Sequence, residues 1–144
     1  MIYCDTSYLV RLYLAEPGHE AVRELCYKDQ VASAGHALVE VPAALHRAFR
    51  EGRLASAIFQ ACVEQFQNDC AAEAYLWLPV EAALVASMAG RYAKLPQTAF
   101  LRAADALHLA CAAEHGFTEV YSNDRHFLAA ASLFGLKGIN IITS

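Results

Sequence analysis

Short apolar segments that favour β-strands alternate along this chain with longer segments that favour helices, and this alternation constrains the fold most strongly. The expected strands cover residues 2–4, 31–33, 75–78, 119–121 and 139–142. The expected helices cover residues 6–14, 19–27, 36–50, 54–71, 81–93 and 101–112, with a last helix that ends before Gly135. Strands that alternate with helices predict an α/β fold, in which a mainly parallel sheet carries helices on both faces.

The length and composition fit one domain that spans residues 1–144. Of the 144 residues, 57% are apolar and 18% charged, which excludes a disordered chain and predicts many buried helix faces. No apolar run reaches the ~18–20 residues of a membrane span, and no secretory signal is visible, so we expect a cytoplasmic protein without membrane contact. The five scattered cysteines include no Cys-x-x-Cys pair, which fits reduced core residues.

One carboxylate lies where the helical pattern of residues 101–112 predicts a buried face. Asp105 falls on the same side as Leu101, His108 and Leu109 at about 100° per residue. An ionised acid buried without a partner costs several kcal/mol or more, so it must be neutralised, paired or bound to a metal. Arg102, one turn earlier, could supply a local ion pair, and this simpler explanation holds for the helix taken alone.

Two other acids follow expected strands directly. Asp5 comes after the first strand and Asp124 after the strand that ends at Tyr121, so both should lie at the carboxyl edge of a parallel sheet, where such folds place their functional crevice. Each acid also has a simpler role, because Asp124 can cap the last helix and Asp5 can belong to a turn that Thr6 caps. Asp105 is a third acid with a simple structural explanation of its own. Three separate structural explanations for three acids are less convincing together than each is alone.

Clustered carboxylates without a histidine or cysteine pattern favour a hard divalent cation. Mg²⁺ and Mn²⁺ prefer oxygen ligands, and such an ion can orient a phosphodiester and activate water. Zinc is disfavoured because the six histidines show no ligand spacing, and the chain contains no phosphate-binding glycine loop or nucleophile elbow. The residues alone therefore predict an acidic metal site for phosphoryl chemistry.

Four segments resemble the signatures of the PIN domain, namely residues 2–7, 38–41, 104–110 and 122–127. Their order and spacing over the whole chain resemble the VapC-type ribonuclease toxins of toxin–antitoxin pairs. The resemblance implies a three-layer α/β/α sandwich with a five-stranded parallel sheet and a metal-dependent RNA-cleaving site.

Matched by position, the resemblance implies that Asp5, Glu40, Asp105 and Asp124 bind Mg²⁺ or Mn²⁺ and carry catalysis. Glu40 taken alone would be assigned as a solvated helix acid. The hydroxyls of Thr6 and Ser122 would support the carboxylates, with Ser122 orienting Asp124. The implied partners are an RNA substrate and a basic antitoxin protein, in a type II toxin–antitoxin module.

The net charge of −4 excludes a surface that coats nucleic acid broadly, so a few cations at the rim of the metal site must hold RNA. The candidates are Arg11, Arg47 and Arg125, with Arg47 first because it shares a helix face with Glu40. All three could also be ordinary solvated arginines, or could pair with nearby carboxylates in the free protein. The apolar excess, together with the resemblance, predicts a homodimer, and Leu14, Phe49 and Phe59 are expected to line a groove for an antitoxin segment.

Two other functions compete with the ribonuclease hypothesis. The chain could act mainly as a docking module, for instance as co-repressor with a DNA-binding antitoxin, and cleavage of RNA by the purified protein separates the two hypotheses. A phosphatase of the haloacid-dehalogenase type also carries an Asp after its first strand. That family requires a second Asp two residues later, where this chain has Ser7.

Overall fold

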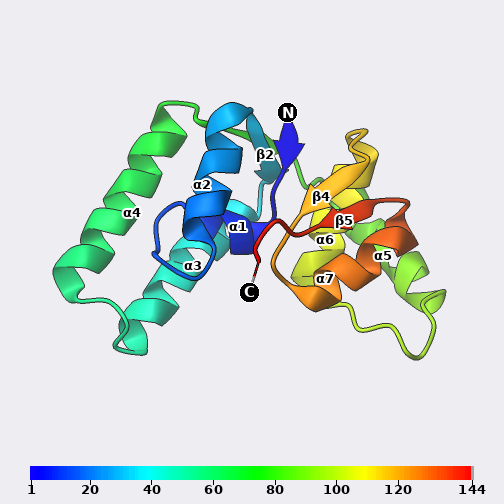
Figure 1. Ribbon diagram of the computed structural model, residues 1–144. Coiled ribbons are helices and arrows are strands. Elements are labelled where there is room, and N and C mark those ends of the chain that lie inside the picture. The colour runs from blue at the N-terminus through cyan, green and yellow to red at the C-terminus, as the bar shows by residue number, and fades with distance from the viewer. Residues whose placement is uncertain (144) are drawn as a thin grey trace.

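The computed structural model describes residues 1–143 and contains short parallel strands flanked by helices (Figure 1). The strands are β1 (Ile2–Tyr3), β2 (Val31–Ala34), β3 (Tyr75–Leu78), β4 (Glu119–Tyr121) and β5 (Lys137–Ile139). The helices are α1 (Thr6–Val10), α2 (His19–Lys28), α3 (Ala37–Arg50), α4 (Ser56–Ala71), α5 (Ala82–Ala93), α6 (Ala103–Glu114) and α7 (Arg125–Ala130), followed by the 3₁₀ turn η1 (Ala131–Phe134). The predicted α/β alternation is therefore confirmed.

The five strands form two parallel sheets, which corrects the expectation of one five-stranded sheet. One sheet has the order β1-β2-β3 and the other pairs β4 with β5. Within residues 1–143, the backbone links between the two sheets are a single bridge from Cys4 to Tyr121 and the hydrogen bond from Asp5 N to Tyr121 O, at 3.0 Å. The reason is the length of β1, which covers two residues and leaves no ladder for β4 to extend.

Several element boundaries also differ from the sequence prediction, among them the start of α6, which lies at Ala103 instead of residue 101 because Arg102 has the extended backbone of an N-cap, with φ −76° and ψ 152°. The last strand covers Lys137–Ile139, because the chain turns into the sheet directly after Gly135, whose φ is +72°. The first helix ends at Val10, and the last one changes into a 3₁₀ turn at Ala131. Among residues 1–143, no helix combines the length and the apolar character that crossing a bilayer requires.

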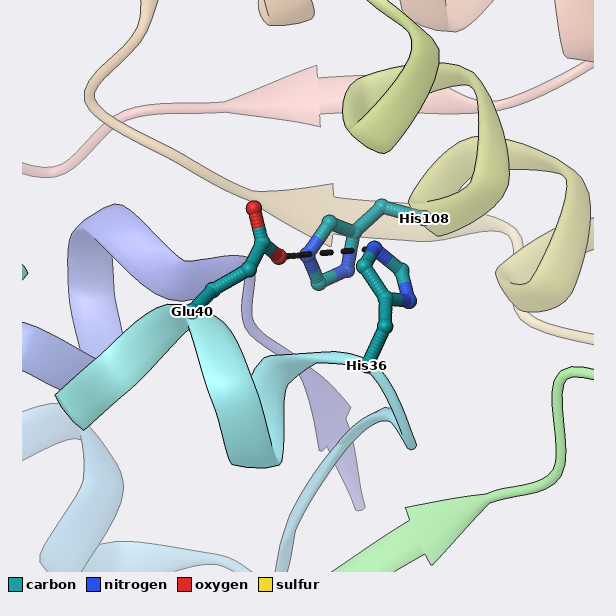
Figure 2. A group of neighbouring side chains, drawn as sticks. All are labelled: His36, Glu40 and His108. Atoms are coloured by element: carbon teal, nitrogen blue, oxygen red, sulfur yellow. Dashed lines mark hydrogen bonds and ion pairs between the residues drawn. The ribbon is translucent and has the colours of Figure 1, made fainter. Parts of the chain in front are cut away.

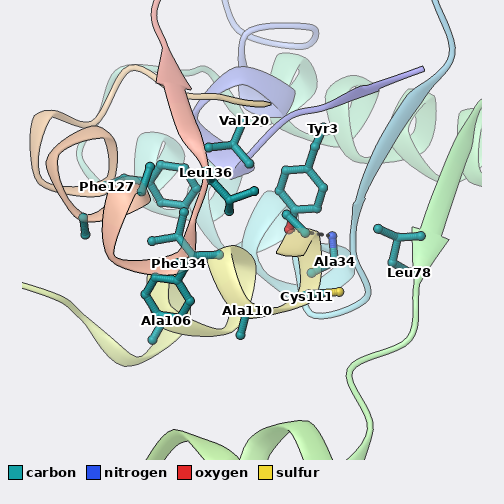
Figure 3. Packing of buried hydrophobic residues seen from close by; sticks show 14 of the residues in the cluster. Tyr3, Ala34, Leu78, Ala106, Ala110, Cys111, Val120, Phe127, Phe134 and Leu136 are labelled. Atoms are coloured by element: carbon teal, nitrogen blue, oxygen red, sulfur yellow. Dashed lines mark hydrogen bonds between the residues drawn. The ribbon is translucent and has the colours of Figure 1, made fainter. Parts of the chain in front are cut away.

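Two hydrophobic cores lie on the two sides of the strands. One core holds α1–α4 through residues such as Leu9, Val41 and Leu45, and the other holds α5–α7 through residues such as Leu109 and Phe127. Figure 1 shows the corresponding separation, with α2–α4 on one side and α5–α7 on the other. Figure 3 shows the second core, in which Tyr3 of β1 and Val120 of β4 lie near Phe127, Phe134 and Leu136, the residue just before β5. This arrangement places the carboxyl ends of β1 and β4 beside α3 and α6.

Helix α3 buries a slightly different face from the one predicted. Val41 and Leu45 are buried as expected, whereas Leu38 is 40% and Phe49 36% exposed. Ala37 and Ala48 are buried instead, because small side chains allow α3 to pack closely against α1. This rotation leaves Glu40 beside the carboxyl edge of β1.

Candidate active site

Asp5 ends the β1 segment and begins α1. Its Oδ1 accepts hydrogen bonds from Ser7 Oγ at 2.6 Å and from Tyr8 N at 3.2 Å, so the side chain caps the helix. Its Oδ2 accepts from Ser122 Oγ at 2.6 Å. The residue is only 4% exposed, and burial raises the pKa of its carboxyl although these hydrogen bonds oppose the rise. Asp5 thus holds a charge whose desolvation a nearby cation would offset.

Asp124 has the predicted capping role at α7 and a second role besides. Its Oδ1 accepts from the backbone N–H groups of His126 and Phe127, at 2.8 and 3.2 Å. Its Oδ2 pairs with Nη2 of Arg102. Ser122 accepts a hydrogen bond from Asp124 N at 2.9 Å while it donates to Asp5, so one buried hydroxyl joins the two acids at the carboxyl edge.

Asp105 lies in the first turn of α6, half-buried, and contacts the same arginine. The Nε of Arg102 donates to Asp105 Oδ2 at 3.3 Å. Burial raises the pKa of Asp105, Arg102 lowers it in part, and the charge of Asp124 raises it further. The local ion pair considered from the sequence therefore exists. It is weak, because the Arg102 side chain is 59% exposed to solvent.

Glu40 lies on α3, where the imidazole rings of His36 and His108 face its carboxylate (Figure 2) and Thr6 contacts the same oxygen. Its Oε1 accepts from Thr6 Oγ1 at 2.9 Å and from His108 Nε2 at 2.7 Å, and His36 Nε2 lies 3.4 Å away. Burial raises the pKa of the Glu40 carboxyl, but the interactions with His108, Thr6 and His36 outweigh burial and hold that pKa below its usual range. Glu40 is therefore an ionised acid at neutral pH.

All four predicted acids line one pocket of about 400 Å³, which we call the acidic pocket. Its lining consists of Asp5, Thr6, Ser7, Glu40, Arg47, Arg102, Ala104, Asp105, His108 and Asp124. The donors facing it are mostly carboxylate and hydroxyl oxygens, which fit a hard divalent cation better than a soft one. The exposed Arg102 already places a positive charge between two of the acids, which shows that this set of charges accommodates a cation.

The three candidate arginines occupy different places. Arg47 lines the acidic pocket with its side chain 70% exposed and paired to Glu51. Arg125 is exposed on α7, outside the pocket lining. Arg11 is 7% exposed and donates to the backbone oxygens of Ser7 and Pro17, so we remove it from the candidates for RNA contact.

Sequence reasoning missed His36 and assigned Arg102 only as a possible ion-pair partner of Asp105. The ligand atoms of His36, Glu40 and His108 lie within 4.8 Å of one another. The spacing of His36 and Glu40, four residues apart on one helix face, was the available signal. His108 could not be joined to them from the sequence, because it comes from α6, 68 positions after Glu40.

Three solved structures have a fold similar to that of this chain. VapC20 of Mycobacterium tuberculosis, described as a sarcin–ricin loop cleaving toxin, is similar in structure with a TM-score of 0.70 and 20% identity, over 90% of this chain and 95% of that one. FitAcB of Neisseria gonorrhoeae is similar with a TM-score of 0.69 and 17% identity, over 97% of both chains. VapBC2 of Rickettsia felis, solved with a DNA fragment from its promoter, gives a TM-score of 0.64 and 14% identity, over 97% of this chain and 98% of that one.

At these identities the structural likeness establishes the fold alone. No curated protein sequence matches the chain significantly. The model of the PIN domain family matches residues 2–133, a span that contains all four acids of the pocket. The chain therefore belongs to the PIN domain family.

Proposed function

We propose that this protein is an endoribonuclease that depends on Mg²⁺ or Mn²⁺ and acts as the toxin of a type II toxin–antitoxin pair. The observation that carries the proposal is the convergence of Asp5, Glu40, Asp105 and Asp124 on one pocket at the carboxyl edge of β1 and β4. The likeness to a toxin that cleaves the sarcin–ricin loop supports RNA as the substrate class.

The four carboxylates would hold the ion, which when bound orients a phosphodiester and activates a water molecule. Ser122 and Ser7 keep Asp5 in place through their hydroxyls, and Thr6 does the same for Glu40. Arg102 balances Asp105 and Asp124 while the pocket holds no ion. Arg47 at the rim supplies a positive charge for the RNA backbone.

The test incubates the purified chain with a defined RNA, with and without Mn²⁺ and EDTA. We expect cleavage that needs the metal and that is lost in Asp5→Asn, while the fold persists by circular dichroism. Glu24→Gln is the matched control, because Glu24 is an exposed acid on α2 paired with Lys28, away from the pocket. Cleavage that survives EDTA, or an absence of Mn²⁺ binding by calorimetry, contradicts the proposal.

The second candidate function, docking of an antitoxin, can coexist with cleavage. Phe49 of α3 and Phe59 of α4 stack at 4.9 Å with 8° between their rings, and Phe49 is 36% exposed. These two rings would receive an apolar segment of the partner. Leu14 is only 5% exposed, so it supports this surface from within the core. If a short basic protein is encoded beside this chain, Phe49→Ser should weaken its binding and leave Mn²⁺ binding intact.

A further inference from the structure

The two oxygens of Glu40 have different surroundings. Oε1 faces three polar groups, Thr6 Oγ1 at 2.9 Å, His108 Nε2 at 2.7 Å and His36 Nε2 at 3.4 Å. Oε2 has no partner among residues 1–143, and Figure 2 shows it on the side away from both imidazole rings. One oxygen is thus fixed by the protein, and the other remains available to a ligand in the acidic pocket.

His108 connects Glu40 to the interior of the sheet. It is 1% exposed, and its Nδ1 lies 2.6 Å from the hydroxyl of Tyr3. That hydroxyl accepts from Ala34 N at 3.2 Å, so its own proton is available for donation to Nδ1. His108 Nε2 faces the Glu40 carboxylate, which can only accept, so Nε2 is the donor of this hydrogen bond. A series of hydrogen bonds therefore connects Ala34 of β2, through Tyr3 of β1 and His108 of α6, to Glu40 of α3.

His36 ties the same helix to the neighbouring acid. Its Nε2 lies 3.1 Å from the carbonyl oxygen of Ala104, the residue before Asp105. A carbonyl oxygen can only accept a hydrogen bond, so Nε2 of His36 is the donor in this contact. The contact fixes α3 relative to the first turn of α6, and with it Glu40 relative to Asp105.

We infer that His108 is a positioning residue, which binds one oxygen of Glu40 so that the other points into the acidic pocket as a metal ligand. The inference rests on the proposed metal site and adds to it a group outside the four acids. Groups that hold a metal ligand in place contribute to affinity, and their loss weakens metal binding by about 10- to 100-fold.

The rival explanation is a separate ion bound by His36, Glu40 and His108 themselves. The geometry favours positioning, because Nε2 of each ring lies within hydrogen-bond distance of an oxygen acceptor, Ala104 O for His36 and Glu40 Oε1 for His108, and His108 Nδ1 is paired with Tyr3. The remaining ring nitrogen, His36 Nδ1, is buried without a hydrogen-bond partner among residues 1–143. Binding of Zn²⁺ that requires both histidines but not Asp5 or Asp105 would overturn the inference.

Two substitutions of His108 separate its two nitrogens. His108→Gln places an amide N–H near the position of Nε2 and can still donate to Glu40, whereas His108→Asn reaches only the position of Nδ1, near Tyr3. Mn²⁺ affinity is measured by calorimetry on each folded variant, with the melting temperature recorded in EDTA. We expect His108→Asn to bind Mn²⁺ about 10-fold more weakly or worse, and His108→Gln to stay within about threefold of the native protein.

A purely structural role through Tyr3 predicts the opposite order, and that result would overturn the inference. In a Glu40→Gln background, His108→Asn should change Mn²⁺ affinity by less than about twofold, because its effect passes through Glu40; independent losses would contradict this. If His108→Asn fails to fold, Thr6→Val removes another donor to Oε1 and should also weaken Mn²⁺ binding, and native affinity in that variant overturns the inference. A native protein that binds no Mn²⁺ overturns the proposed function itself.

Discussion

At the scale of single residues, the acids of the pocket combine a structural role with an available charge. Asp124 uses one oxygen to cap α7 and the other to pair with Arg102, and Glu40 gives Oε1 to the protein and leaves Oε2 free. The simple assignments considered from the sequence, an N-cap and a local ion pair, are therefore correct but incomplete. Sequence patterns cannot distinguish the two roles, because the same oxygen chemistry serves both.

Asp105→Asn should stabilise the metal-free protein, and the gain should increase with pH. Burial raises the pKa of Asp105 above its unfolded value of about 3.9, so the stability that the protonated acid provides is present below that value and is lost as the pH rises through the folded pKa. Asparagine does not titrate, so the variant does not lose stability in this way as the pH rises. Urea unfolding in EDTA at pH 4 and pH 7 measures the difference, and a variant less stable than the native protein at pH 7 would indicate a structural pair with Arg102.

Arg102→Gln should bind Mn²⁺ more tightly than the native protein. The guanidinium competes with a metal ion for Asp105 and Asp124, and an exposed ion pair is worth about 0.2–1 kcal/mol, which corresponds to a gain of about 1.5- to 5-fold. Calorimetry at constant ionic strength measures the change. Arg125→Gln, an exposed arginine outside the pocket lining, is the control, and weaker binding in Arg102→Gln would indicate that this arginine supports the site.

At the scale of elements, helix α3 connects packing to function. Its apolar period predicted a buried face correctly at Val41 and Leu45, but the face is centred nearer Ala37 and Ala48 than the large side chains suggested. Periodicity locates a stripe to within a residue or so on the helix, whereas the closeness of the α1 contact decides which flank is covered. That small rotation determines where Glu40 points.

Ala48→Leu should destabilise the protein by about 1–3 kcal/mol, because Ala48 is fully buried and the larger side chain overfills the first core. The matched control is Ala43→Leu, an exposed position of the same helix, where the change should be within about 0.5 kcal/mol. Urea unfolding of both variants provides the comparison. Equal stability of the two would mean that α3 does not pack as tightly as the structure indicates.

At the scale of the whole molecule, the alternation of strands and helices sufficed to predict parallel pairing and the edge at which the acids meet. It did not predict that the strands divide into two sheets, because that depends on how many residues of the β1 segment pair with β4. The contact between the rings of His36 and His108 could not be predicted from the sequence either. It joins α3 to α6 across 72 positions of sequence, and no local pattern records such a contact.

The homodimer remains a prediction, and exposed apolar side chains near the pocket suggest a test. Val39, next to Glu40 on α3, is 70% exposed. Val39→Glu should convert a dimer into a monomer at micromolar concentration in sedimentation velocity, since a charge buried at an interface lacks a partner. Tyr27→Ser on α2, where Tyr27 is 95% exposed, is the control and should stay dimeric. A native protein that sediments only as a monomer contradicts the prediction.

An acidic molecule must hold RNA through few cations, and Arg47 is the one candidate arginine of the sequence prediction that lines the acidic pocket. Each neutralised phosphate contributes about 0.7 to the slope of log affinity against log salt for single strands. Arg47→Ala should therefore weaken RNA binding and reduce that slope by about 0.7, while Mn²⁺ affinity stays nearly native.

The binding is measured with the Asp5→Asn variant, so that the RNA is not cleaved during a salt titration. Arg50→Ala is the matched control, because Arg50 is exposed on the same helix but does not line the pocket. An unchanged slope in Arg47→Ala would remove Arg47 from the RNA site and assign the phosphate contacts to other residues.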